Sequence, residues 1–456
     1  MSESSFFSDL LASIAQQGRR LLGPAPEAPR ASGLDALRLE CEALLESTGE
    51  ASRIAVARSV LDHWAASGEE VRAAFFLVLR QDFGPDRERL AKAVEAWGAA
   101  PTPESEAALH EAAEPRRQEL IRRLALAPDG MAGLMRMREA LLRLLPVNRS
   151  LKVVDDDFAH LFSSWFNRGF LVLRPIDWTT PANVLEKIIR YEAVHEIRDW
   201  EELRRRLEPP DRRCFAFFHP RLVDEPLIFV EVALTQSMPE SVAEVLDPGR
   251  EPIRAEEAGA AVFYSISNCQ DGLRGVSFGN FLIKQVVEDL RRDLPRSRPF
   301  VTLSPVPGFA EWLSGELADP ASDTLAAEDR ETLAALEDRG WMDDEPKAEA
   351  LRPALARACA IYLVHARNRR GQPADPVARF HLGNGARLER VNVMADRSPR
   401  AERQAHGMMV NYLYELDEIE QNHEAYAARG KVAASTSVKR LARRPKAAEK
   451  ETEAAR

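Results

Sequence analysis

The sequence predicts an all-helical N-terminal bundle followed by an α/β domain. Residues 34–165 carry apolar side chains at three- to four-residue spacing almost without interruption. After Gly169, short runs rich in valine, isoleucine and phenylalanine replace this pattern. The length of 456 residues also fits two domains. We therefore expect a helical domain at residues 1–168, an α/β domain at 169–429 and a disordered basic tail at 430–456.

Proline and glycine divide the N-terminal half into separate helices. Apolar residues at helical spacing run through LDALRLECEALLES, SVLDHWAASGEEVRAAFFLVL and MAGLMRMREALLRLL. The breaks fall at Gly84-Pro85, Pro101 to Pro103, Pro128 to Gly130 and Pro146. These connections are short enough for antiparallel packing. Because no polar cluster in this half resembles a catalytic site, we predict a scaffold or oligomerisation role.

The charge balance and the cysteines exclude several classes of protein. The 62 basic and 72 acidic residues give a net charge of −10, which argues against a nucleic-acid partner. Charged residues interrupt every apolar run before it reaches membrane-spanning length, so no membrane partner is expected. The four cysteines, Cys41, Cys214, Cys269 and Cys359, are scattered along the chain and show no CxxC spacing of the kind that binds zinc. We therefore expect no metal site and a reducing compartment.

The first 23 residues are predicted to form an amphipathic helix. Glu3 and Asp9 are acidic where a secretory signal peptide or a mitochondrial presequence would be basic. Arg19 and Arg20 fit a presequence, but the early acids count against it. We therefore expect a cytoplasmic protein.

The second half alternates strand-like and helix-like segments. The strand-like runs are FLVLRPI, CFAFFHP, EPLIFVEVALT, AAVFYSIS and PFVTLSP, and the helical ones include PANVLEKIIRYEAV and GNFLIKQVVEDLRRDL. Residues 317–349 form an acidic, helix-prone insertion whose charges we interpret as a solvated face, and 350–367 form another helix. The tail from 430 has almost no bulky apolar side chain, which predicts disorder.

A glycine-rich loop follows the run AAVFYSIS. Gly272, Gly275 and Gly279 lie between this strand and a helix, where backbone amides and the helix dipole can bind pyrophosphate without a lysine. No GK[ST] follows, so the loop is not a Walker motif. From spacing alone, a plain turn remains an alternative.

This loop carries a family resemblance. Arg274-Gly275-Val276-Ser277-Phe278-Gly279 resembles the R/Q-x-x-G-x-G/A pyrophosphate loop of the GCN5-related N-acetyltransferase fold, although Ser277 stands where the general motif has glycine. A serine at this position instead resembles one branch of that fold, the malonyl-CoA decarboxylase family. Further matching segments occur in the family order: EPLIFVEVALT, FYSISNCQDGLRGVSFGNFLIKQVV, LSPVPGF, FHLGNGA, NVMAD and NYLYELDEIEQNHEAY. The resemblance covers essentially the whole second half.

The resemblance implies an enzyme with a GCN5-related N-acetyltransferase-like catalytic domain. Such an enzyme converts malonyl-CoA to acetyl-CoA and CO2 through a thioester enolate, and needs no cofactor beyond the coenzyme A of its substrate. Ser304 and His381 are implied to bind the malonyl end and to be catalytic, with the order of their proton transfers open. By analogy with the fold, backbone amides near residues 267–269 are implied to donate hydrogen bonds to the oxyanion of the enolate. The implied coenzyme A contacts are Arg274, Gly275, Val276, Ser277, Phe278, Gly279 and Asn280.

The residues around Ser304 and His381 have a physical logic of their own. Ser304 ends a strand-like run, and the prolines that follow force the chain out of the sheet. His381 precedes Gly383-Asn384-Gly385, a turn that favours positive φ and can aim the ring into a cleft. A serine-proline strand end and a lone histidine beside a turn are also common structural features, so only the resemblance selects them.

Two other functions stay open at this point. An acyl-CoA-dependent N-acyltransferase would use the same loop but would need an amine-acceptor site. A non-catalytic acyl-CoA sensor would bind malonyl-CoA without releasing CO2. The resemblance also implies a homo-oligomer, and we expect a tetramer.

Overall fold

The computed structural model describes residues 33–276, 282–293, 299–337 and 340–444. The chain divides into two compact units, and the predicted N-terminal helix lies outside the described residues. Unit 1 contains residues 1–172, 217–227 and 268–279, and unit 2 contains 173–216, 228–267 and 280–456. In the part of the chain that is described, no helix is long and apolar enough to cross a membrane.

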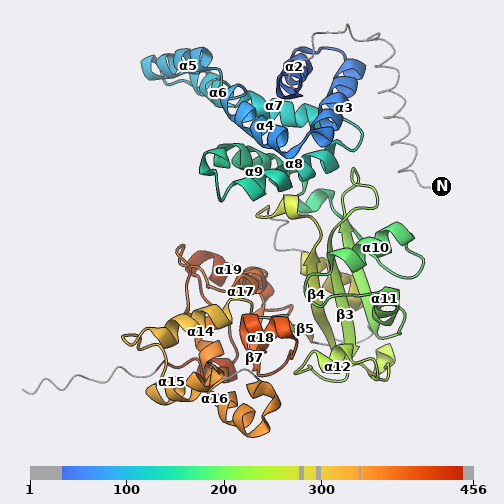
Figure 1. The fold of residues 1–456 in the computed structure, drawn as a ribbon, viewed down its shortest axis with the longest axis vertical. Coiled ribbons are helices and arrows are strands. Elements are labelled where there is room, and N and C mark those ends of the chain that lie inside the picture. The colour runs from blue at the N-terminus through green and yellow to red at the C-terminus, as the bar shows by residue number, and fades with distance from the viewer. Residues whose placement is uncertain (1–32, 277–281, 294–298, 338–339, 445–456) are drawn as a thin grey trace, which may run out of the picture. The chain divides into compact units, whose positions relative to one another are not determined.

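The core of unit 1 is the predicted helical bundle. Apolar residues at helical spacing, such as Leu37, Cys41 and Leu44, are fully buried. Asp86 caps one helix, and Thr102 forms a capping box with Ser105 at the start of another, as expected where prolines break the chain. The helices are α2 (Gly33–Glu46), α3 (Glu50–Ala66), α4 (Glu69–Gln81), α5 (Arg87–Ala99), α6 (Pro103–Ala113), α7 (Arg116–Ala125), α8 (Gly130–Leu144) and α9 (Lys152–Trp165) (Figure 1).

Unit 1 also holds the first part of the glycine-rich loop. Arg138 on α8 makes a buried ion pair with Asp155 at 2.9 Å and donates to the carbonyl oxygen of Gly272 at 2.7 Å. A Cβ atom on Gly272 would collide with the backbone of Met135. The start of this loop is therefore packed directly on helix α8.

The sheet has the order β1-β2-β3-β4-β5-β8-β6, with β7 paired to β8. Its first four strands are neighbours in chain order. β4 and β5 are parallel and are joined through helix α13 (Leu282–Asp293). The strands are β1 (Val172–Pro175), β2 (Arg212–Phe218), β3 (Pro226–Thr235), β4 (Ala260–Asn268), β5 (Phe300–Thr302), β6 (Ser304–Pro305), β7 (Arg387–Asn392) and β8 (Met409–Tyr414).

Helices α10 (Ala182–Tyr191) and α11 (Trp200–Leu207) lie beside β3 and β4 (Figure 1). Buried polar contacts attach this layer to the sheet. Glu192, just after α10, accepts hydrogen bonds from Ser265 and Ser267 on β4. Arg206 on α11 pairs with the fully buried Glu231 on β3 at 2.9 Å. Together with the helical bundle, this mixed sheet domain confirms the predicted fold class.

The other α-helices of unit 2 lie between the later strands or after β8. Those that position the site or the C-terminal segment are α14 (Phe309–Ala318), α16 (Glu345–His365), α17 (Pro376–Gly383), α19 (Ile419–Arg429) and α20 (Thr436–Leu441). The others are α12 (Ala243–Leu246), α15 (Ala327–Leu333) and α18 (Pro399–Ala405).

Two segments differ from the sequence expectation. In the acidic insertion, Asp329 is buried and pairs with Arg357 of α16 at 3.0 Å, so not all of its charges lie on a solvated face. In the expected tail, residues 430–444 are structured, because Leu388 of β7 pairs with Ala434 and helix α20 buries Val438. Residues 445–456 lie outside the described part of the chain.

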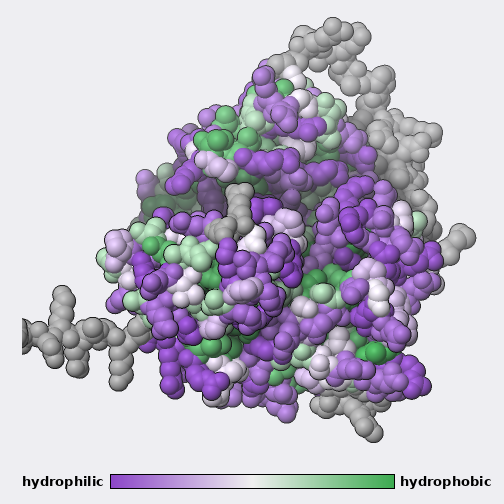
Figure 2. Space-filling model, turned by 60° about the horizontal axis from the view of Figure 1, so that its bottom comes forward, coloured by the Kyte–Doolittle hydropathy of each residue, from purple (hydrophilic) through white to green (hydrophobic). Residues whose placement is uncertain are grey.

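The surface agrees with a composition in which 29% of residues are charged. On the face drawn in Figure 2, hydrophilic residues predominate and hydrophobic residues form small separate groups. The cysteines do not contribute to this surface, because all four are buried.

Candidate active site

Ser304 lies on one face of the sheet together with two tyrosines. It belongs to β6, where it pairs directly with Val410 of the antiparallel strand β8. Alternate residues of a strand share a face, so Val410, Tyr412 and Tyr414 point the same way as Ser304. The chain then leaves the sheet at Pro305 and starts α14 at Phe309, as the prolines predicted.

Helix α17 places His381 over these residues. Asp375 begins the helix as its N-cap and accepts a hydrogen bond from the amide of Ala378 at 2.8 Å. His381 stands in the last turn of α17 and is 2% exposed. Of the following turn, Gly385 alone has a positive φ, at 81°, and a Cβ atom there would collide with the carbonyl oxygen of Ile419.

The structure brings Ser304 and His381 into direct contact. Nε2 of His381 lies 3.1 Å from Oγ of Ser304, and the serine hydroxyl donates to Oγ1 of Thr302 at 2.8 Å. Nδ1 of His381 lies 2.8 Å from the hydroxyl of Tyr414. The imidazole also stacks on the ring of Tyr412, with 4.5 Å between the ring centres. The ring is therefore held by hydrogen bonds at both nitrogens and by packing on one face.

The hydrogen-bond network assigns a tautomer to the neutral imidazole. Burial lowers the pKa of His381 to about 3, so the unliganded protein carries a neutral ring at physiological pH. The Ser304 hydroxyl donates its proton to Thr302, so its oxygen accepts from Nε2–H of His381. Nδ1 then accepts the proton of the Tyr414 hydroxyl. The imidazole proton consequently points toward Ser304.

A second polar group lies at the start of α17. Asp375 is 1% exposed, and its Oδ2 atom has no hydrogen-bond partner among the described residues. Burial raises the pKa of this carboxyl to about 6. Oδ2 lies 4.0 Å from the position that a Cβ atom on Gly308 would occupy. The same added Cβ atom would collide with the hydroxyl of Tyr362.

The predicted coenzyme A loop is described only in its first part. Arg274 is exposed and pairs with Asp271 at 3.0 Å, and Gly275 has a φ of 78°, which glycine adopts without strain. Val276 is buried. The other predicted loop contacts, Ser277, Phe278, Gly279 and Asn280, lie outside the described residues.

One of the predicted oxyanion donors is already in use. The amide of Cys269 donates to the carbonyl oxygen of Leu227 at 2.9 Å. It is therefore committed to the sheet and not free for a substrate oxygen. Ser265 and Ser267, earlier on β4, direct their hydroxyls to the carboxylate of Glu192.

Sequence reasoning missed the partners of the histidine. Tyr412 and Tyr414 stand in the quoted segment NYLYELDEIEQNHEAY, but no role was assigned to them. Their spacing of two residues on a strand was a usable signal, because it places both rings on one face. Thr302 lies two residues before Ser304, and its hydroxyl also accepts from the amide of Tyr412 at 3.2 Å.

Comparison with known protein families identifies the class of this chain. Residues 169–453 match the model of the malonyl-CoA decarboxylase C-terminal domain. The chain belongs to the malonyl-CoA decarboxylase family. Residues 83–166 match the model of the malonyl-CoA decarboxylase N-terminal domain, although no motif in that half carried the resemblance. The predicted enzyme class, a carboxy-lyase, is therefore confirmed.

Other members of the malonyl-CoA decarboxylase family match most of the chain. The mitochondrial malonyl-CoA decarboxylase of Anser anser anser is 35% identical over 399 residues, which are 80% of this chain and 79% of the relative. The crystal structure of malonyl-CoA decarboxylase from Rhodopseudomonas palustris is 57% identical, with a TM-score of 0.87. That from Agrobacterium vitis is 59% identical, with a TM-score of 0.86. Both alignments cover 90% of this chain and 100% of the other.

Proposed function

We propose that this protein decarboxylates malonyl-CoA to acetyl-CoA and CO2, with Ser304 and His381 at the malonyl end of the substrate. The observation that carries this proposal is the buried contact between Nε2 of His381 and Oγ of Ser304, at 3.1 Å, in a chain of the malonyl-CoA decarboxylase family. No G-x-S-x-G elbow surrounds Ser304, so the serine is not assigned as an acyl nucleophile.

The reaction breaks one carbon–carbon bond and forms one carbon–hydrogen bond. The electron pair of the bond to the carboxylate moves toward the thioester carbonyl as CO2 leaves, which gives an enolate. Protonation of the enolate carbon gives acetyl-CoA, and the thioester stays attached to coenzyme A throughout. The protein must orient the carboxylate, exclude water and deliver a proton.

The burial of His381 suits it for proton delivery. A malonyl carboxylate beside Nε2 would raise the pKa of the imidazole, because an opposite charge favours the protonated ring. When CO2 leaves, that partner is lost and the imidazolium is again in a site where burial disfavours its charge. It then becomes a strong acid next to the enolate. Ser304, bonded to Nε2, positions the carboxylate and can relay the proton.

The loop from Arg274 to Asn280 is proposed to bind the pyrophosphate and pantetheine arm. This role rests on the loop motif and on the positive φ of Gly275, which lets the backbone approach an anion closely. Contacts made equally in the ground state and the transition state affect KM more than kcat. Arg274→Ala should therefore raise KM for malonyl-CoA and leave kcat within about threefold.

The test supplies malonyl-CoA without metal, nucleotide or amine and follows CO2 and acetyl-CoA. We expect equal amounts of both products. His381→Ala and Ser304→Ala should each lower kcat by about 10²- to 10⁴-fold, the usual contribution of a positioned acid or base. The exposed His110→Ala on α6 serves as a matched control and should keep full activity. Coenzyme A binding without any CO2 release by the wild type would contradict the proposal and favour an acyltransferase or a sensor.

A further inference from the structure

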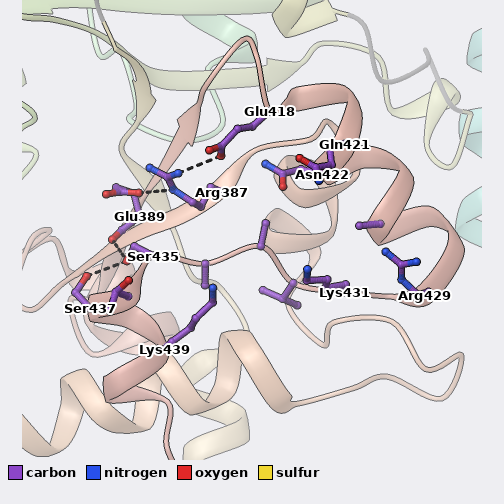
Figure 3. Close-up of a pocket in the computed structure, with 15 residues that line it drawn as sticks. Arg387, Glu389, Glu418, Gln421, Asn422, Arg429, Lys431, Ser435, Ser437 and Lys439 are labelled. Carbon is purple, nitrogen blue, oxygen red and sulfur yellow. Dashed lines mark hydrogen bonds and ion pairs between the residues drawn. The ribbon is translucent and has the colours of Figure 1, made fainter.

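A polar cleft lies between the start of β7, helix α19 and the segment that leads into α20. Its volume is about 690 Å³, within the range of small-molecule sites. We name it the α19–α20 cleft. Figure 3 shows its charged and polar side chains, drawn from all three elements. It is lined by Arg387, Glu389, Glu418, Gln421, Asn422, Ala425, Arg429, Lys431, Val432, Ala433, Ala434, Ser435, Thr436, Ser437 and Lys439.

The charges of the cleft are unevenly paired. Arg387 bonds to two carboxylates, those of Glu389 at 2.8 Å and Glu418 at 3.0 Å. Arg429, Lys431 and Lys439 have no carboxylate within ion-pair distance among residues 33–276, 282–293, 299–337 and 340–444. Both acids of the cleft are thus engaged by one arginine, and three cations have no ion pair within the described part of the chain. In a chain with a net charge of −10, this is a local surplus of positive charge.

Backbone bonds fix the frame of the cleft. Gly430 ends α19 with a φ of 62° and turns the chain back along β7. The amide of Leu388 donates to the carbonyl oxygen of Ala433, and the amide of Ser435 donates to that of Leu388, each at 2.9 Å. Ser435 also caps α20 by accepting from the amide of Val438 at 3.2 Å. The backbone that carries Lys431 and Lys439 is therefore preformed.

The α19–α20 cleft is separate from the proposed substrate site. His423 on α19 contacts the carbonyl oxygen of Gly383, at the end of the helix that carries His381. Glu420, three residues earlier and thus on the same side of α19, pairs with Lys284 of α13 at 2.8 Å. The cleft uses the opposite side of α19, and none of the active-site residues lines it.

We infer that the α19–α20 cleft binds a small polyanion, a molecule with two or more oxyanion groups. Arg429, Lys431 and Lys439 supply charge from three adjoining parts of the fold, and hydroxyl and amide side chains supply further hydrogen bonds. The lining contains no aromatic side chain and only small or medium apolar ones, so it offers little to an apolar ligand. This ligand site goes beyond the proposed decarboxylation.

Isothermal titration of the full chain tests the inference with two probes, inorganic pyrophosphate and propane-1,2,3-tricarboxylate. Saturating coenzyme A is present, so that the substrate site is filled. We expect the wild type to bind at least one probe, more weakly as salt is raised. Lys431→Ala/Lys439→Ala should lower that affinity at least tenfold. The probe that binds more tightly distinguishes a phosphate ligand from a carboxylate ligand.

The control variant is Arg440→Ala, which removes an exposed cation from the same helix without touching the cleft. It should keep wild-type affinity for the probe, and the double variant should keep its KM for malonyl-CoA within about twofold. Absence of binding to the wild type, or equal affinities of the wild type and the double variant, would overturn the inference. A raised KM in the double variant would also overturn it, because the cleft would then belong to the substrate site.

Discussion

Nδ1 of His381 lies 2.8 Å from the hydroxyl of Tyr414, while Nε2 of the same ring faces Ser304. The tyrosine therefore fixes both the tautomer and the direction of the imidazole. Both residues are buried, and burial also raises the pKa of Tyr414 well above its ordinary value, so the tyrosine stays a neutral donor. We assign Tyr414 as a positioning residue, because it acts through His381.

Removal of the Tyr414 hydroxyl should impair catalysis with little effect on substrate binding. In Tyr414→Phe, Nδ1 of His381 loses its donor and remains buried, which costs about 1–3 kcal/mol for an unsatisfied polar group. If this loss falls on the transition state, kcat drops about tenfold to hundredfold. Steady-state kinetics should show the change in kcat with KM within about threefold. Tyr426→Phe on α19 is the matched control, and equal losses in both variants would contradict the assignment.

The buried imidazole of His381 should make stability depend on pH. Its pKa is lowered to about 3 in the folded protein, from 6.5 for an ordinary histidine. Between these values the unfolded chain binds a proton that the folded chain does not, so the contribution of His381 to the unfolding free energy falls as pH falls, by about 1.4 kcal/mol per pH unit. His381→Gln removes this contribution. In denaturant titrations from pH 6.5 to 4.5, the stability of the wild type relative to His381→Gln should therefore fall, and a constant difference between the two would contradict a neutral buried ring.

Asp375 should contribute a pH dependence of the opposite sign. Burial raises its pKa from 3.8 to about 6, so the unfolded chain releases this proton at lower pH than the folded chain. The contribution of Asp375 to the unfolding free energy of the wild type therefore falls as pH rises from 4 to 6. Asp375→Asn keeps an oxygen to cap Ala378 but carries no charge. We expect its stability relative to the wild type to rise over this range, by roughly 1.4 kcal/mol per unit of pKa shift.

A second variant separates the charge of Asp375 from its cap. Asp375→Ala also removes the charge but loses the acceptor for the Ala378 amide, which typically costs about 1 kcal/mol. Urea denaturation at pH 4.5 and 7.5 should therefore rank the alanine variant below the asparagine variant at both pH values. A constant difference between Asp375→Asn and the wild type would show that the carboxylate does not titrate in this range.

The two halves of the proposed site differ in how far the sequence predicts them. Local chemistry predicts the exit of the chain from the sheet at Ser304, because proline acts on its own neighbours. The contact of Ser304 with His381 joins residues 77 positions apart, and pairing of β6 with β8 joins residues more than 100 apart. Such pairings depend on tertiary packing, which periodicity in one segment does not specify. Only the family resemblance selected the serine and the histidine, and it left Tyr414 without a role.

The C-terminal segment shows a second limit of composition. Residues 430–444 contain few bulky apolar side chains, which predicted disorder. The structure instead fixes them through backbone bonds to Leu388 and through burial of Ala434, Val438 and Ala442. Small side chains suffice here because β7 supplies the hydrogen-bond partners. Composition shows that large apolar residues are missing, but it does not show that the edge of a strand is available for backbone hydrogen bonds.

Gly308 is a position where a single methyl group should disturb the surroundings of the site. It is the last residue but one of the segment LSPVPGF, and a Cβ atom there would collide with the hydroxyl of Tyr362, whose buried ring packs on Phe309 and Trp312. Because this ring has little room to move, Gly308→Ala should lower the unfolding free energy by about 1–3 kcal/mol, as overpacking does. Thermal denaturation measures the change.

The compensating variant removes the colliding oxygen instead of the methyl group. Tyr362→Phe keeps the ring and its packing, so Gly308→Ala/Tyr362→Phe should recover most of the stability lost in Gly308→Ala. A double-mutant cycle separates this coupling from the effect of each change alone. Additive losses would mean that the methyl group disturbs the backbone beside Asp375 rather than the tyrosine. If the double variant recovers kcat together with stability, the collision with the Tyr362 hydroxyl, and not the loss of the glycine itself, causes any loss of activity in Gly308→Ala.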